Sequence, residues 1–169
     1  MSHLRTLTGI ALTLALTSAS ALAQQPPRPT APVQPLEYAA KIVCGRHSGD
    51  NDGGQPMMAA GNYFTAVNVH NPARPVRLSH KVTLAGVGRP GPMTDIRTDI
   101  TLEYDQAVDF DCRWIVDRLR SVGIAAPPFF TGFLVLQTRA QVDVVAVYSA
   151  GADRVATMHT ERVPVRRVQ

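Results

Sequence analysis

The sequence predicts an all-β domain: an antiparallel β-sandwich, immunoglobulin-like, of about seven to eight short strands with one short helix. Three observations predict it. Several segments alternate apolar and polar residues with a period of two, the pattern of half-buried strands. Turns rich in Gly and Pro separate these segments, and only one segment has helical spacing. A small closed barrel is the alternative arrangement for the same pattern.

The first residues have the three parts of a signal peptide. A short segment with Arg5 and no acidic residue precedes the apolar run Gly9–Leu16, and small residues lead to Ala21-Leu22-Ala23, a cleavage motif. The run is too short to span a bilayer, which needs about 20 residues. We therefore expect residues 1–23 to be removed and no transmembrane segment to remain. This places the protein in the periplasm, outside the cell or on its surface; an uncleaved anchor is the alternative.

Residues 24–36 contain five prolines. Such a composition is typical of an extended, polyproline-like linker without a packed core. The β domain is therefore expected to occupy residues 37–169, a length that suits one domain.

The first half of the domain is predicted to hold four strands. They are a strand from Glu37 with Tyr38, Ala40, Ile42 and Cys44 on one face; Gly61–His70; Val76–Leu84 with His80 on its apolar face; and Ile96–Tyr104 with Ile96, Thr98, Ile100, Leu102 and Tyr104 inward. Residues 47–56 and 85–95 are predicted loops because Gly, Pro, Asn and Asp are frequent there.

The second half begins with the single predicted helix, Cys112–Val122, with Asp111 as its N-cap and Gly123 at its end. Two strongly apolar strands follow, Phe129–Thr138 and Val142–Ala150. Both are apolar on both faces, which is typical of central strands buried on two sides, and the short connection 139–141 predicts a hairpin. A last strand is predicted near residues 155–163, before a basic tail.

Cys44 and Cys112 are the two cysteines of the chain. An even number in an exported protein favours a disulfide. The bond would close a loop of roughly 70 residues and contribute about 4 kcal/mol in the chain-entropy description. Two buried free thiols are the alternative. A structural zinc site is not expected from two cysteines, because it needs four ligands at characteristic spacings.

Five segments carry a resemblance to a known group of proteins. They are Lys41-Ile-Val-Cys-Gly45, Gly61-Asn-Tyr-Phe-Thr-Ala-Val-Asn-Val-His-Asn-Pro72, Asp109-Phe-Asp-Cys112, Gly132-Phe-Leu-Val-Leu136 and Val142-Asp-Val-Val-Ala-Val-Tyr148. In these segments the chain resembles small exported bacterial and archaeal single-domain β-sandwich proteins of uncharacterised function. The resemblance implies one domain with one disulfide, and it implies no catalytic residue.

Two histidines are placed where they could serve a site. His70 shares a strand face with Asn68, just before Asn71-Pro72. This pair predicts a small polar site, or a strand end whose side chains hold the turn. His80 lies on an apolar strand face, where a hydrogen-bonded core histidine is a better interpretation than a metal ligand.

No motif for catalysis, metal binding or cofactor binding stands out. Asp50, Asn51 and Asp52 suggest a calcium loop, but its twelfth position is Gly61, where an EF-hand loop has Glu. Asp99 and Glu103 share an outward face and are interpreted as solvated surface, not as a paired acid and base. A formal net charge of +4 is too small to imply nucleic acid. We therefore expect no catalytic residue, metal or cofactor.

The loop Gly123–Phe130 is apolar and uncharged. Phe129 and Phe130 are adjacent and point to opposite sides of an extended chain, so one ring could enter the core while the other contacts a partner. The alternative is that the loop covers the end of the sandwich and buries both rings.

The absence of a motif favours an exported, non-enzymatic module that binds an envelope or extracellular macromolecule or supports a cell-envelope assembly. A hydrolase with an unrecognised site and a small periplasmic ligand- or metal-binding protein are the alternatives. A convergent pocket of titratable residues would favour the hydrolase. A flat apolar patch or an exposed sheet edge would favour the module.

Overall fold

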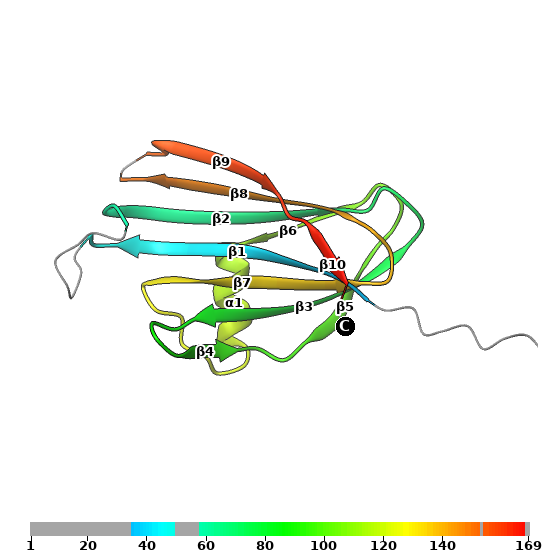
Figure 1. Ribbon diagram of the computed structural model, residues 1–169, viewed down its shortest axis with the longest axis horizontal. Coiled ribbons are helices and arrows are strands. Elements are labelled where there is room, and N and C mark those ends of the chain that lie inside the picture. The colour runs from blue at the N-terminus through cyan, green and yellow to red at the C-terminus, as the bar shows by residue number, and fades with distance from the viewer. Residues whose placement is uncertain (1–34, 50–57, 153, 168–169) are drawn as a thin grey trace, which may run out of the picture. The chain divides into compact units, whose positions relative to one another are not determined.

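One antiparallel β-sheet and one short helix make up the described part of the chain (Figure 1). The structure is a computed structural model that describes residues 35–49, 58–152 and 154–167, all within one compact unit. The predicted signal peptide, residues 24–34 of the predicted linker and the calcium-loop candidate at 50–52 lie outside the described residues.

The elements follow the chain in this order: β1 (Leu36–His47), β2 (Gly61–His70), β3 (Val76–Ala85), β4 (Pro90–Met93), β5 (Arg97–Leu102), β6 (Ala107–Asp111), α1 (Cys112–Arg120), β7 (Phe129–Thr138), β8 (Asp143–Gly151), β9 (Thr157–Arg162) and β10 (Val165–Arg167). The predicted all-β class with one short helix is confirmed. The immunoglobulin-like sandwich stays a prediction, because the hydrogen bonds join the strands into one open sheet.

The sheet runs β4-β3-β7-β1-β2-β8-β9, so β4 and β9 are the two ends of this path. β1 and β2 pair only where Gly45–His47 meets Gly61–Tyr63. Beyond that point the sheet forks: β10 pairs with the other end of β1, and β6 pairs with the other half of β2. The Tyr38 hydroxyl donates to the Val142 carbonyl oxygen at 3.0 Å and so connects the two branches.

The core is formed by residues from one face of β1, β3 and β7 and from one face of β2, β6 and β8. Alternate residues supply it, as a period of two requires. Its fully buried side chains include Ile42, Leu78, Val82, Leu134, Leu136, Val67, Val69, Phe110 and Val144. Along Val76–Leu84 the buried positions are the alternating ones predicted from the sequence.

The helix α1 packs against β1, β2, β3 and β6, behind the sheet as seen in Figure 1. Asp111 caps its N-terminus by accepting a hydrogen bond from the Trp114 amide at 2.7 Å, as predicted. Ile115 and Leu119 are buried one turn apart. Gly123 follows the helix with φ of 76°, a conformation that glycine adopts at little cost.

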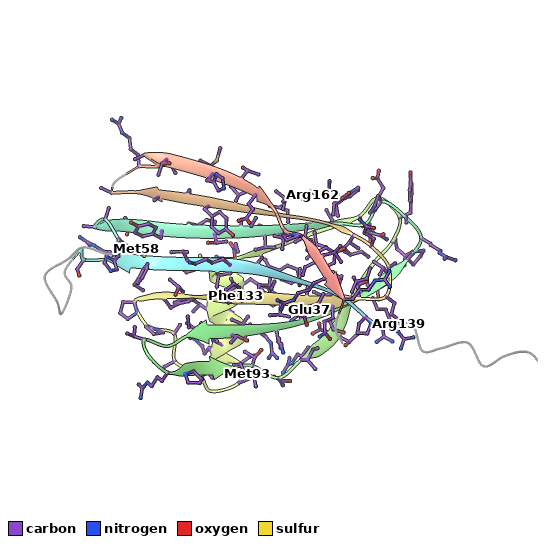
Figure 2. All side chains as sticks on the ribbon, in the orientation of Figure 1. Glu37, Met58, Met93, Phe133, Arg139 and Arg162 are labelled. Carbon is purple, nitrogen blue, oxygen red and sulfur yellow. A yellow bond between two sulfur atoms is a disulfide. The ribbon has the colours of Figure 1, made fainter. Side chains whose placement is uncertain are left out.

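The predicted hairpin between the two most apolar strands is wrong. β7 lies between β3 and β1, whereas β8 lies between β2 and β9, so the short connection crosses from one branch of the fork to the other. The apolar residues on both faces of these strands do not mark complete burial either. Phe133 on β7 is 43% exposed on the open face of the sheet (Figure 2).

Two further expectations from the alternating pattern are corrected. Ile96, Thr98 and Tyr104 are exposed and not inward as predicted, and Ile96 and Tyr104 lie beyond the ends of β5. β5 pairs only with β3, and its register shifts between Leu78 and His80, so the period of two does not persist along it. The predicted loop 85–95 contains the short strand β4, and the basic tail contains β10.

Candidate functional site

The Cys44–Cys112 disulfide is present, with the two Cα atoms 5.7 Å apart and 68 positions apart in the chain. It joins the inward face of β1 to the first residue of α1. The amide of Thr65 on β2 donates to the Cys112 sulfur at 3.2 Å. The bond therefore stands where β1, β2 and α1 meet and is part of the core.

The predicted polar pair on β2 has one exposed and one bonded member. Asn68 is exposed. His70 Nε2 lies 2.9 Å from an Asp105 carboxylate oxygen, and Nδ1 lies 3.6 Å from Asp143. The Asp105 hydrogen bond, with Asp143 adding to it, raises the pKa of His70 above its ordinary value. Asp143 also accepts from Arg162 at 2.8 Å, so these side chains connect the turn after β5 to β8 and β9.

His80 is a hydrogen-bonded core histidine, as predicted. It is 2% exposed, its ring lies against Phe110 and Trp114, and its Nε2 is 2.7 Å from Asp99. The hydrogen bond from His80 lowers the pKa of Asp99. Asp99 is thus exposed but not merely solvated, because it provides the polar partner that a buried imidazole needs.

The two adjacent phenylalanines differ in burial. Phe130 is buried in the core, and Phe129 is partly exposed. The Phe129 ring packs edge-on against His47, with centroids 4.8 Å apart, and against Tyr63 at 5.7 Å. Phe129 therefore belongs to a small aromatic group at the end of the sheet where β1 and β2 meet, and a role as partner contact stays a prediction.

The last strand of the path, β9, is exposed along its whole length. All six of its residues, Thr157–Arg162, are exposed, and Met158 is 69% exposed. Within the described residues β9 pairs only with β8, so its outer edge has no strand beside it. Backbone N–H and C=O groups along such an edge can pair with another extended chain.

The register shows which backbone groups face outward. Val163 donates to the Val144 carbonyl oxygen at 2.9 Å, one step beyond the pair Val145 and Arg162. Hydrogen-bonded and non-hydrogen-bonded pairs alternate in an antiparallel ladder. The amides of Met158 and Thr160 therefore point away from β8, and the amide of His159 points toward it.

A hollow of about 360 Å³ lies beside this edge. Tyr148 and His159 form one wall with their rings stacked, 6.2 Å between centroids and 17° between planes. Lys41, Tyr63 and Glu161 also line it. Burial, with the nearby Glu161 carboxylate adding to it, raises the pKa of Tyr148 to about 12.

A second hollow of about 280 Å³ lies where β8 turns into β9, lined by Phe64, Ser149 and Val155 among others. Phe64 pairs with Ser149, and Ser149 pairs with Met158. Their side chains lie on the face opposite to Tyr148 and His159, because successive residues alternate faces. A chain added beside β9 would therefore find a hollow near each of its two faces.

Few sequence features indicate the exposed edge of β9 and its two hollows. A strand that is exposed on both faces has no apolar period, and residues 157–162 show none. The one indication was indirect. Tyr148 and Phe64 lie on predicted strands that have apolar side chains on both faces, and aromatic side chains on both faces of a strand cannot all be buried in one core.

No family model, curated protein or solved structure matches the chain. The resemblance to small exported proteins therefore remains an interpretation of the sequence motifs. No helix among the described residues is long and apolar enough to cross a membrane. Among the same residues, no three His, Cys, Asp or Glu side chains are grouped so as to hold a metal ion.

Proposed function

We propose that the chain is an exported, non-enzymatic binding module that captures an extended segment of a protein partner along β9. The observation that carries the proposal is a six-residue edge strand whose every residue is exposed. The signal-peptide pattern supports export, and the Cys44–Cys112 disulfide is consistent with it. The partner is an envelope or extracellular protein that presents an unpaired, extended stretch.

Strand addition separates affinity from specificity. Main-chain hydrogen bonds to the outward groups of Met158 and Thr160 supply affinity for any extended chain. Alternate side chains of that chain then meet different surroundings: the stacked rings of Tyr148 and His159 on one face, and Phe64 with Met158 on the other. We expect the preferred segment to carry an apolar residue at alternate positions.

The sandwich expected from the sequence belongs to this proposal. The fork, which opens on the Leu36 side of Gly45, supports it, because core residues come both from the branch with β3, β7, β1 and β10 and from the branch with β6, β2, β8 and β9. In such an arrangement β9 is the outer strand of one layer, which is where sandwiches present edges for recognition.

The partly exposed ring of Phe129 favours a second contact. The ring lies beside Tyr63, which also lines the hollow of about 360 Å³ near β9. A partner would reach Phe129 only if its chain left β9 and crossed the end of the sheet past β8, β2 and β1. Of the two predicted contact residues, Phe129 is the one whose ring can touch a partner. Phe130 is buried in the core and cannot.

Replacement of one outward amide tests the proposal. Thr160→Pro removes an outward donor, and Thr160→Val keeps it at nearly the same side-chain shape. Peptides selected on the wild-type protein from a displayed library should bind Thr160→Pro about tenfold or more weakly, the cost of lost main-chain bonds, and bind Thr160→Val nearly unchanged.

Circular dichroism melts of both variants control for folding. Equal binding by Thr160→Pro and the wild type would contradict strand addition at β9. A selection that returns no peptide, together with release of a small-molecule product from substrate panels, would favour the hydrolase alternative.

A further inference from the structure

A further hollow lies away from β9. It measures about 710 Å³, within the usual range for small-molecule sites. It is formed between the start of β3, the end of β7 and the loops beside them. Figure 2 places Arg139, which lines it, at the opposite end of the domain from Met58, which lines the hollow beside β9.

Three arginines line this hollow: Arg74, Arg77 and Arg139. No Asp or Glu is among the described residues that line it. None of the three forms an ion pair with a described carboxylate, whereas Arg97, Arg118, Arg120, Arg162 and Arg166 each do. Arg46, Arg89, Arg113, Arg154 and Arg167 likewise form no such pair, so what distinguishes the three is that they line one hollow. Glu37, which accepts from Gln137 at the hollow's edge, is itself paired with Arg166.

Each of the three arginines stands on a fixed piece of backbone. Arg77 is on β3, and its guanidinium donates to the Thr98 carbonyl oxygen at 3.3 Å. Arg139 lies in a turn where the buried Thr138 hydroxyl bonds both the carbonyl oxygen and the amide of Ala140, at 3.1 and 3.3 Å.

Arg74 is held by Asn71, which is fully buried. The Asn71 side-chain amide donates to the carbonyl oxygens of Arg74, Leu102 and Glu103, at 3.1, 2.9 and 2.9 Å. Prolines at 72 and 75 further restrict this loop. A loop fixed in this way loses little conformational entropy when its arginine binds a ligand.

Uncompensated guanidinium groups that converge on one hollow repel one another, and an anion relieves that repulsion. Guanidinium groups bind carboxylate, phosphate and sulfate through paired hydrogen bonds. The hydroxyls of Ser79 and Thr98, 2.6 Å apart, and the amide of Gln137 add neutral polar groups to the wall. From this placement we propose that the hollow binds a polyvalent organic anion, one that carries two or more phosphate, sulfate or carboxylate groups.

The test uses isothermal titration of the purified chain with citrate and with pyrophosphate at low salt. The Arg74→Gln/Arg139→Gln double variant should bind about tenfold or more weakly than the wild type. The Arg89→Gln/Arg113→Gln variant loses the same charge from the β3–β4 turn and α1, away from the hollow, and should bind within about twofold of the wild type. Melting temperatures of both double variants should stay close to the wild type, because all four positions are exposed.

Further arms distinguish the sources of such an anion. Co-sedimentation with phosphatidylcholine vesicles, with and without phosphatidylglycerol, tests for a lipid headgroup. A titration with polygalacturonate tests for an acidic glycan. Binding in either experiment supports the site if the Arg74→Gln/Arg139→Gln variant loses it and the Arg89→Gln/Arg113→Gln variant keeps it. Equal weakening by both double variants would show a net-charge effect and overturn it. Binding of a single-stranded oligonucleotide alone, or of none of the probes, would also overturn it.

Discussion

The two ends of the sheet solve the problem of an open edge in opposite ways. β4 has four residues, and two of them, Pro90 and Pro92, lack an amide donor. Its Gly91 is pressed so close to β3 that an added Cβ would lie 2.2 Å from the Leu84 carbonyl oxygen. β9 has six residues, no proline and an exposed side chain at every position. Short strands and prolines are the usual protection against unwanted pairing.

Under the proposed function, the difference between the edges indicates which of them would bind a partner chain. β4 can offer few main-chain bonds to a second chain, whereas β9 offers a continuous row beside two hollows. The charged residues of β9, Glu161 and Arg162, stand at one end, which leaves Thr157–Thr160 as the open stretch. An unprotected edge is a liability unless a partner covers it. Of the two ends of the strand path β9 is the unprotected one, and this is why we propose binding there.

The largest expected effect is a loss of stability when the core disulfide is removed, without a loss of binding at the β9 edge. Cys112→Ser removes the bond that joins β1 to α1 and should lower the free energy of unfolding by about 2–5 kcal/mol, as for small exported domains. Urea unfolding followed by the fluorescence of Trp114 measures it. Peptide affinity at β9 should be unchanged under conditions where the variant is folded, because the disulfide does not contact β9; a matching loss of affinity would break the distinction.

An intermediate effect is expected from a matched pair of methionines. Met158 on β9 and Met93 on β4 are 69% and 64% exposed. Met158→Lys places a charge on the open edge, the device by which natural edges resist pairing, and should weaken peptide binding by about fivefold. Met93→Lys should leave it unchanged.

Fluorescence anisotropy of a labelled peptide measures both methionine variants. If Met93→Lys weakened binding as much as Met158→Lys, the two edges would be equivalent and the contrast between them would be lost.

The smallest expected effect concerns pH. Asp105 and Asp143 raise the pKa of His70 in the folded protein. A raised folded pKa gives stability that is present below the ordinary value of 6.5 and is lost as pH rises through the folded pKa. The melting temperature should therefore fall slightly as pH rises above that value, and His70→Asn should remove this slope. A slope of opposite sign, or one that His70→Asn leaves intact, would contradict the assignment.

Sequence patterns predicted the parts of the fold that rest on local periodicity. β2 and β7 have the predicted boundaries, the helix begins after Asp111, and the two cysteines pair. Each of these depends on residues near one another in sequence or on the chemistry of an exported chain.

Which strands pair with one another in the sheet could not be predicted in the same way. The short connection 139–141 predicted a hairpin of β7 and β8, but these strands lie in separate branches of the sheet, which no local pattern indicates. Exposed strands without a period, such as β9, and strands shortened by proline, such as β4, give no alternating signal. Similarly, Arg74 and Arg77 are far from Arg139 in the sequence, and only the folded chain brings the three to one hollow.

Amide hydrogen exchange along β9 tests the central claim most directly. In the free protein the amides of Met158 and Thr160, which face outward, should exchange rapidly, and that of His159, which faces β8, should exchange slowly. A bound peptide should slow Met158 and Thr160 by about a hundredfold, since each gains a main-chain hydrogen bond, and change His159 little. Unchanged exchange at Met158 and Thr160, with new protection confined to Gly123–Phe130, would show that the partner binds elsewhere and would contradict strand addition at β9.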